Sequence, residues 1–198
     1  GALREYAWSE TSQAKWALRR LLGDLGRGIP SSIFAMMDMK YQRKFEDGKN
    51  QRWYTYGLLK ANADKGVAYK KPAYYAVQNL TSIFDHSLSR IKHYGYLCSF
   101  DEHLSLFAYE NKGSKKQLIT IWKDENIPSD KNQLKKGDFT FHTANFNTPV
   151  WVDMLTGEVY KIPDDNWEKS GNQYRFKNIP VYDAPILIAD LSLIPLNK

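Results

Sequence analysis

The sequence predicts an α+β protein in two parts, residues 1–87 and residues 88–198. In the first part, apolar residues recur at helical spacing on either side of a short continuous apolar run. The second part has short alternating runs separated by turn residues, which is typical of an antiparallel β-sandwich. A chain of 198 residues, 42% of them hydrophobic, is long enough for one or two small domains with a core.

The first part is predicted to run helix, buried strand, long loop, helix. Apolar residues on one face predict a helix over residues 10–25, with Ser9 as its N-cap and Gly26 or Gly28 near its end. Residues 31–37 are almost continuously apolar, which favours a strand buried on both faces, as in a parallel sheet. A loop follows, and Pro72 is placed to open a second helix.

The second part is predicted to consist of short antiparallel strands. Residues 104–109 and 117–122 alternate in polarity on either side of a turn sequence, so they predict a hairpin. Further strands are expected at residues 138–142, 149–153, 158–162, 173–176 and 184–189. This spacing indicates a sandwich.

Charge and cysteine content exclude several classes of protein. The net charge of +6 lies entirely in residues 1–85, which hold 14 basic and 8 acidic residues, whereas residues 86–198 hold 14 of each. A basic stretch at residues 40–52 is interleaved with aromatic residues; it fits a solvated loop better than a nucleic-acid patch because no nucleic-acid fold signature accompanies it. The single cysteine, Cys98, excludes an internal disulfide, and the four histidines lack metal-ligand spacing. We therefore expect no metal and no cofactor, no nucleic-acid partner and no membrane span.

Several segments, in the correct order, resemble the end of a clan A retaining glycoside hydrolase. They are Glu5-Tyr6-Ala7-Trp8-Ser9, Gly28-Ile29-Pro30 with residues 33–38, Tyr56-Gly57-Leu58-Leu59, Lys71-Pro72-Ala73-Tyr74-Tyr75-Ala76 and, further on, residues 152–160 and 182–188. The resemblance implies that residues 1–87 are the last β/α elements of a (β/α)8 barrel and residues 88–198 a trailing β-sandwich. A complete barrel needs about 250 residues, so only its end fits in this chain.

The resemblance also implies a catalytic role. Glu5 corresponds to the nucleophile of the family, and Trp8 and Asp38 would lie at the substrate-binding rim. Retaining hydrolysis needs two carboxyl groups about 5–5.5 Å apart, one to attack the sugar and one to act as acid and base. In the family the second carboxyl lies more than a hundred residues upstream, so this chain alone is expected to be inactive. The expected partners are a β-linked saccharide and the rest of the barrel, or an oligomer that covers exposed barrel surfaces, in an extracellular or periplasmic setting.

Two other functions stay open at this stage. A carbohydrate-binding module would use exposed aromatic residues of the sandwich and would need no pair of carboxyl groups. Trp167 is the candidate for that contact because it lies in the polar segment Asp164-Asp165-Asn166-Trp167-Glu168. A basic interaction module would instead use residues 40–52 to bind an anionic polymer.

Overall fold

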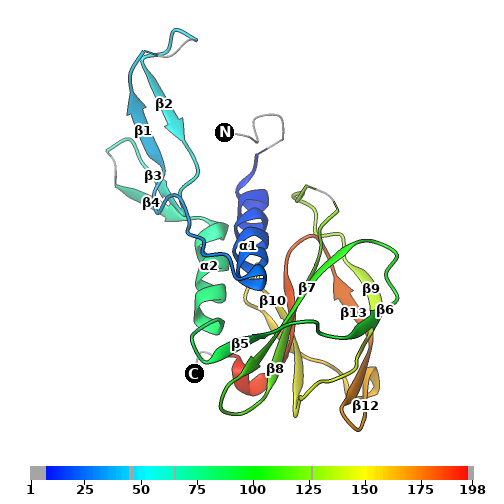
Figure 1. Ribbon diagram of the computed structural model, residues 1–198. Helices are drawn as coiled ribbons and strands as arrows, with labels where there is room; N and C mark the ends of the chain where they lie inside the picture. The colour runs from blue at the N-terminus through cyan, green and yellow to red at the C-terminus, as the bar shows by residue number, and fades with distance from the viewer. Residues whose placement is uncertain (1–7, 45–46, 65, 126, 196–198) are drawn as a thin grey trace.

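A computed structural model describes residues 8–44, 47–64, 66–125 and 127–195. The described chain forms three layers: a pair of helices, a six-stranded sheet and a four-stranded sheet (Figure 1). Two small hairpins extend from the helical layer, at the end of the helices where α1 begins. No helix among these residues is long and apolar enough to cross a membrane.

The six-stranded sheet is antiparallel throughout and occupies the middle layer. Its strand order is β11-β10-β14-β8-β7-β5. The strands are β5 (Leu88–Ile91), β7 (Leu104–Asn111), β8 (Gln117–Lys123), β10 (Pro149–Asp153), β11 (Val159–Lys161) and β14 (Ile186–Asp190). Every residue of β14 is buried, because layers cover both faces of the sheet at this strand.

The four-stranded sheet packs on one face of the six-stranded sheet to form the sandwich. Its order is β12-β13-β9-β6. The strands are β6 (Tyr96–Cys98), β9 (Lys135–Phe141), β12 (Trp167–Ser170) and β13 (Gln173–Val181). Phe139, Phe141 and Phe176 from this sheet meet Ile119 and Ile188 from the other in one buried cluster. Burial of these side chains stabilises the sandwich by roughly 1.5–3 kcal/mol each.

Two α-helices cover the opposite face of the six-stranded sheet. They are α1 (Glu10–Arg27) and α2 (Pro72–Ile83). Successive residues of a strand point to opposite faces, so on β8 Leu118 packs against the helices while Ile119 faces the other sheet. The predicted hairpin and both predicted helices are confirmed, including the Ser9 cap, whose side chain accepts a hydrogen bond from the Ser12 backbone N–H.

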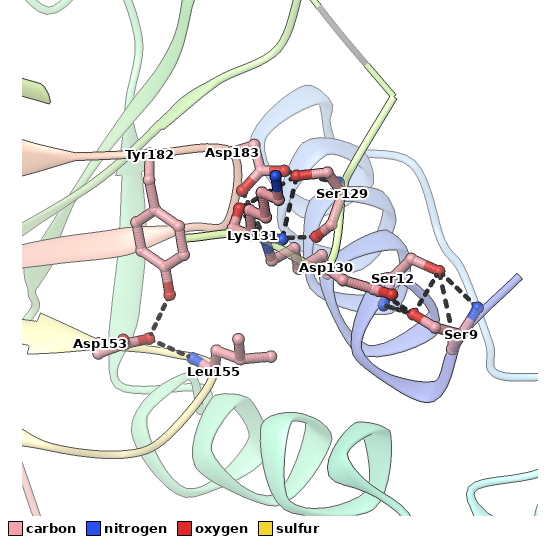
Figure 2. Close-up of polar contacts among 10 residues, drawn as sticks. Ser9, Ser12, Ser129, Asp130, Lys131, Asp153, Leu155, Tyr182 and Asp183 are labelled. Carbon is pink, nitrogen blue, oxygen red and sulfur yellow. Dashed lines mark hydrogen bonds and ion pairs between the residues drawn. The ribbon is translucent and has the colours of Figure 1, made fainter. Parts of the chain in front are cut away.

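A buried lysine ties the helical layer to the sandwich. Lys15 of α1 is fully buried, and its Nζ lies 2.7 Å from Asp183 Oδ1. The same ammonium donates to the carbonyl oxygens of Ser129, at 2.7 Å, and Lys131, at 3.3 Å. Figure 2 shows Asp183, Ser129 and Lys131 gathered beside α1. A charge this deeply buried is tolerated because hydrogen-bond partners surround it.

The predicted barrel end is wrong. The described part of residues 1–87 contains no alternating β/α units; its strands are two antiparallel hairpins, and the fold as a whole is mostly antiparallel β-sheet. The hairpins pair β1 (Met39–Gln42) with β2 (Gln51–Tyr54), and β3 (Leu59–Ala61) with β4 (Val67–Lys70).

The apolar run at residues 31–37 was expected to be a fully buried strand. In the described chain it makes one parallel bridge, between Met37 and Leu59, and accepts backbone hydrogen bonds from Leu58 at Ala35, 3.2 Å, and from Leu59 at Met36, 2.9 Å. Phe34 is 70% exposed and Met36 is 61% exposed. A buried strand needs paired strands on its sides and packed layers on both faces. Among the described residues this run has a neighbour on one side, at Leu58 and Leu59, but no packed layers cover both of its faces. Its continuous apolarity therefore did not indicate burial.

Candidate functional site

Four aromatic rings form a continuous row from the first hairpin to the start of α1. Tyr41 and Tyr54 are cross-hairpin neighbours with ring centroids 5.1 Å apart. Tyr54 lies 5.8 Å from Tyr56, and Tyr56 lies 6.3 Å from Trp8, edge to face. We call Tyr41, Tyr54, Tyr56 and Trp8 the aromatic row. Trp8 is 39% exposed and Tyr41 is also exposed, so both ends of the row are open to solvent.

The row is held against α1 by hydrogen bonds to the backbone. The Gln13 side-chain amide donates to the carbonyl oxygens of Tyr56, at 2.9 Å, and Gly57, at 3.0 Å. The capping box of Ser9 and Ser12 fixes the first turn of α1 directly after Trp8. The Tyr56-Gly57 segment and Trp8 are therefore both anchored to the N-terminal end of one helix.

A groove of about 700 Å³ runs beside the Trp8 end of the row. Its lining includes five aromatic residues, three arginines and one carboxylate: Trp8, Trp16, Phe34, Tyr56, Trp122, Arg19, Arg20, Arg27 and Asp124. The Gln13 Oε1 atom also faces this region, buried and without a hydrogen-bond partner among the described residues. Apolar walls with a few polar groups are the usual composition of a ligand site.

Asp38 lies close to the row but is enclosed by protein. Its side chain is fully buried, and Oδ1 lies 2.6 Å from Lys71 Nζ. Oδ1 also accepts a hydrogen bond from the backbone N–H of Gly57, at 3.2 Å, while Lys60 Nζ is 3.7 Å from Oδ2. The structure thus brings Asp38 and Trp8 to the same Tyr56-Gly57 segment. Asp38 accepts a hydrogen bond from the buried backbone of this segment, and Trp8 contacts its Tyr56 ring.

Two predicted site residues, Glu5 and Trp167, are not among the contacts described above. Glu5 falls outside the described residues. Trp167, on β12, is half-buried and stacks at 5.9 Å on Tyr174 within the four-stranded sheet. Its indole Nε1 is buried without a hydrogen-bond partner among the described residues. No group of three or more histidine, cysteine or acidic residues in the described chain could hold a metal ion.

One further carboxylate lies at this end of α1. Glu10, in the first turn, accepts a hydrogen bond from the Tyr69 hydroxyl at 2.9 Å. That hydrogen bond to the carboxylate raises the pKa of Tyr69. The contact joins the second hairpin to the helix that follows Trp8.

The described residues of the basic stretch 40–52 lie in β1, in β2 and in the segment between them. Arg52 pairs with Asp47 at 2.6 Å, and Lys49 lies 4.0 Å from the same carboxylate. Lys40 lies over the Trp53 ring, 5.7 Å from its centroid. Some of these basic side chains therefore interact with an acidic or aromatic residue of the same hairpin region.

No family model and no curated protein matches the chain. The candidate site therefore depends on its own geometry and on the sequence resemblance.

Sequence reasoning named Trp8 as a candidate but did not include its neighbours Tyr41, Tyr54 and Tyr56. The available signal was the spacing of Tyr54 and Tyr56, since residues two apart in an extended chain point to the same side. Tyr41 could not be added without the hairpin register, which places it opposite Arg52 and diagonal to Tyr54.

Proposed function

We propose that the chain carries the nucleophile and part of the saccharide-binding surface of a retaining glycoside hydrolase that acts on a β-linked poly- or oligosaccharide. The observation that carries the proposal is the aromatic row, which ends at Trp8, three residues after Glu5. Rows of aromatic rings suit sugars because a pyranose presents a face of C–H groups that packs on a ring, leaving its hydroxyl groups to hydrogen-bond.

The chemistry proposed for Glu5 is attack on the anomeric carbon. Its carboxylate oxygen forms the bond to the sugar as the bond to the leaving oxygen breaks, which creates a covalent glycosyl-enzyme. Water then releases the sugar with the original configuration. The acid/base carboxyl that protonates the leaving oxygen would come from outside the 198 residues, as the resemblance implies. We therefore expect saccharide binding without turnover of natural glycosides by this chain alone.

Binding is tested by titration calorimetry with β-linked tetrasaccharides of glucose, xylose and mannose. Replacement of Trp8 or Tyr54 by Ala should weaken the binding of the preferred sugar roughly tenfold, because each removes a stacking surface worth about 1 kcal/mol or more. Tyr75→Ala is the matched control, since Tyr75 is an exposed aromatic on α2 outside the row. Unchanged affinity in both row variants would contradict the proposal.

The nucleophile is tested with a 2-deoxy-2-fluoro-β-glycoside that carries a dinitrophenolate leaving group. Dinitrophenolate departs without protonation, so the chain itself can be labelled without its acid/base partner. Peptide mass spectrometry should place the fluorosugar on Glu5, and Glu5→Gln should abolish labelling. Labelling of the Glu5→Gln protein to the same extent would show that another residue reacts.

A further inference from the structure

A second cleft lies at the edge of the sandwich and is lined by residues of the segment 132–182, which follows the aromatic row in the sequence. It has a volume of about 450 Å³ and lies between β10 and β11 of one sheet and the end of β13 in the other. β12 pairs with β13 only over residues 173–176, so residues 179–181 of β13 lack a strand on that side. The two sheets are therefore open to solvent here.

One wall of the cleft is an aromatic platform. Trp151 of β10 and Tyr160 of β11 are directly opposed in the sheet register. Their ring centroids lie 5.8 Å apart and the ring planes are inclined at 49°. The Trp151 indole N–H donates to the carbonyl oxygen of Pro180 at 2.9 Å, which fixes the orientation of its ring. Tyr160 is 53% exposed, so the platform presents aromatic surface to solvent.

Polar groups at the back of the cleft are already satisfied. The Tyr182 hydroxyl donates to Asp153 Oδ1 at 2.8 Å, and the Leu155 backbone N–H donates to the same oxygen at 2.8 Å (Figure 2). Burial raises the pKa of Tyr182, so the phenol stays protonated and keeps donating. The Asp153 Oδ1 atom is therefore already hydrogen-bonded within the protein.

Lysines at the mouth of the cleft differ in their pairing. Lys161 is ion-paired with Asp164 at 3.0 Å. Lys136 and Lys177 also line the cleft, but neither is in an ion pair with any residue of the described chain. Glu158 and the buried Asp153 are the acidic residues of the lining. The accessible charge near the platform is therefore positive but modest.

We propose that this cleft binds a uronate-bearing saccharide, with a sugar ring on Trp151 and Tyr160 and its carboxylate near Lys136 and Lys177. The platform accounts for the ring, and the two unpaired ammonium groups account for the carboxylate. A nucleic acid is the less favoured ligand, because the lining includes Glu158 and only two unpaired lysines. The site is separate from the aromatic row, so it extends beyond the proposed hydrolase function and can fail independently of it.

The test compares two ligands that differ only at C6, β-1,4-linked triglucuronate and cellotriose, by titration calorimetry at low salt. Because the aromatic row is itself proposed to bind β-linked glucose, both titrations use the Trp8→Ala/Tyr54→Ala protein. This protein should bind triglucuronate more tightly than cellotriose, and the preference should shrink as salt screens the carboxylates. Lys136→Met and Lys177→Met should each weaken triglucuronate binding about two- to fivefold, the range for an exposed ion pair. Lys92→Met is the matched control, because Lys92 is exposed and lines none of this cleft.

A separate substitution tests the contribution of the aromatic platform. Tyr160→Ala should weaken the binding of triglucuronate, whereas Trp8→Ala should leave that binding unchanged because Trp8 belongs to the aromatic row. Equal affinity for the two trisaccharides, or loss of binding only with Trp8→Ala, would overturn the proposal. Tighter binding of a single-stranded oligonucleotide than of triglucuronate, lost in Lys136→Met, would overturn it in favour of a nucleic-acid site.

Discussion

Lys71 and Asp38 form an ion pair with almost no contact with solvent. Their charged atoms are 2.6 Å apart, and the two side chains are 1% and 0% exposed. Lys71 immediately precedes α2, and its Nζ also donates to the carbonyl oxygen of Thr55 at 3.1 Å. The pair therefore joins the start of α2 to the segment that carries Tyr56.

Breaking this pair from one side should be strongly destabilising. Lys71→Met leaves the buried Asp38 carboxylate with the Gly57 N–H and the more distant Lys60 ammonium. The loss of one partner of a buried pair costs about 3–5 kcal/mol. Urea unfolding measures the effect. The double variant Asp38→Leu/Lys71→Met should lose less stability than the sum of the single variants, because no uncompensated charge remains. Additive losses would show that the two groups do not interact.

Gly57 makes a close backbone contact that should tolerate no side chain. A Cβ atom at this position would lie 2.2 Å from the backbone carbon of Met37 and 2.2 Å from the backbone nitrogen of Asp38. We expect Gly57→Ala to destabilise the protein by about 1–3 kcal/mol and to displace Tyr56 within the aromatic row. Thermal unfolding and tyrosine fluorescence report the two effects. Gly113→Ala is the control, since its nearest neighbour would be an ordinary 3.5 Å away, and equal stability of both variants would contradict the prediction.

Local signals in the sequence were sufficient for the helices and for most sandwich strands. The apolar spacing, Ser9 and Pro72 act within a few residues of the element that they define, so α1 and α2 could be predicted. Turn residues likewise located the hairpin of β7 and β8. The strands β5, β6 and β12 were missed because they are short and partly exposed, so their polarity does not alternate clearly.

Long-range partners explain what the sequence could not predict. Residues 31–37 have the composition of a core strand. Whether Phe34 is exposed depends on which segments lie beside the run, and composition does not determine those neighbours. Asp38 was predicted at a rim, whereas its burial depends on Lys71, thirty-three residues away. In the candidate site, Trp8 followed from a motif, but its contact with Tyr56 required the fold.

Lys15 should be as important for stability as Lys71, for a different reason. It carries contacts from α1 to Asp183 and to two backbone carbonyl groups of the sandwich, all within the described residues. Lys15→Met keeps much of the apolar stem but removes three donors, so we expect a loss of about 3–5 kcal/mol in urea unfolding. Arg20→Met, at an exposed position on the same helix with a 3.6 Å contact to Asp24, should cost less than about 1 kcal/mol. A comparable loss in both variants would contradict this prediction.

His103 should make stability depend on pH in the neutral range. Its Nδ1 contacts the Asp124 carboxylate, and this hydrogen bond raises the pKa of His103 above its ordinary 6.5. Asp124 is partly buried, which raises its pKa, but hydrogen bonds from Ser105 and His103 outweigh burial and lower it, so the carboxylate is ionised at neutral pH.

A raised pKa in the folded state means that the folded protein binds the proton more tightly than the unfolded chain does. The stabilisation is therefore complete below about pH 6.5 and is lost as the pH rises through the folded pKa of His103. NMR titration of the imidazole should give a pKa above 6.5 that falls in Asp124→Asn. The free energy of unfolding of His103→Gln should not fall over this pH range. An imidazole pKa at or below 6.5 in the intact chain would refute the proposed His103–Asp124 interaction.

Residues 88–198 should not form a stable soluble protein without the helices. The side chains of Leu118, Trp122, Val150 and Leu187 point away from the sandwich core. They are buried in the cluster that includes the inner faces of α1 and α2. A polypeptide of residues 88–198 would expose this apolar face, and large exposed apolar patches promote aggregation. We expect it to bind a hydrophobic dye strongly and to self-associate in analytical ultracentrifugation, whereas the 198-residue chain binds little dye. Replacing Leu118 and Leu187 by Lys in the shorter polypeptide should reduce both effects, because charges then break the patch. A monomeric 88–198 polypeptide that unfolds cooperatively and binds no dye would instead show that the sandwich is independent of the helical layer.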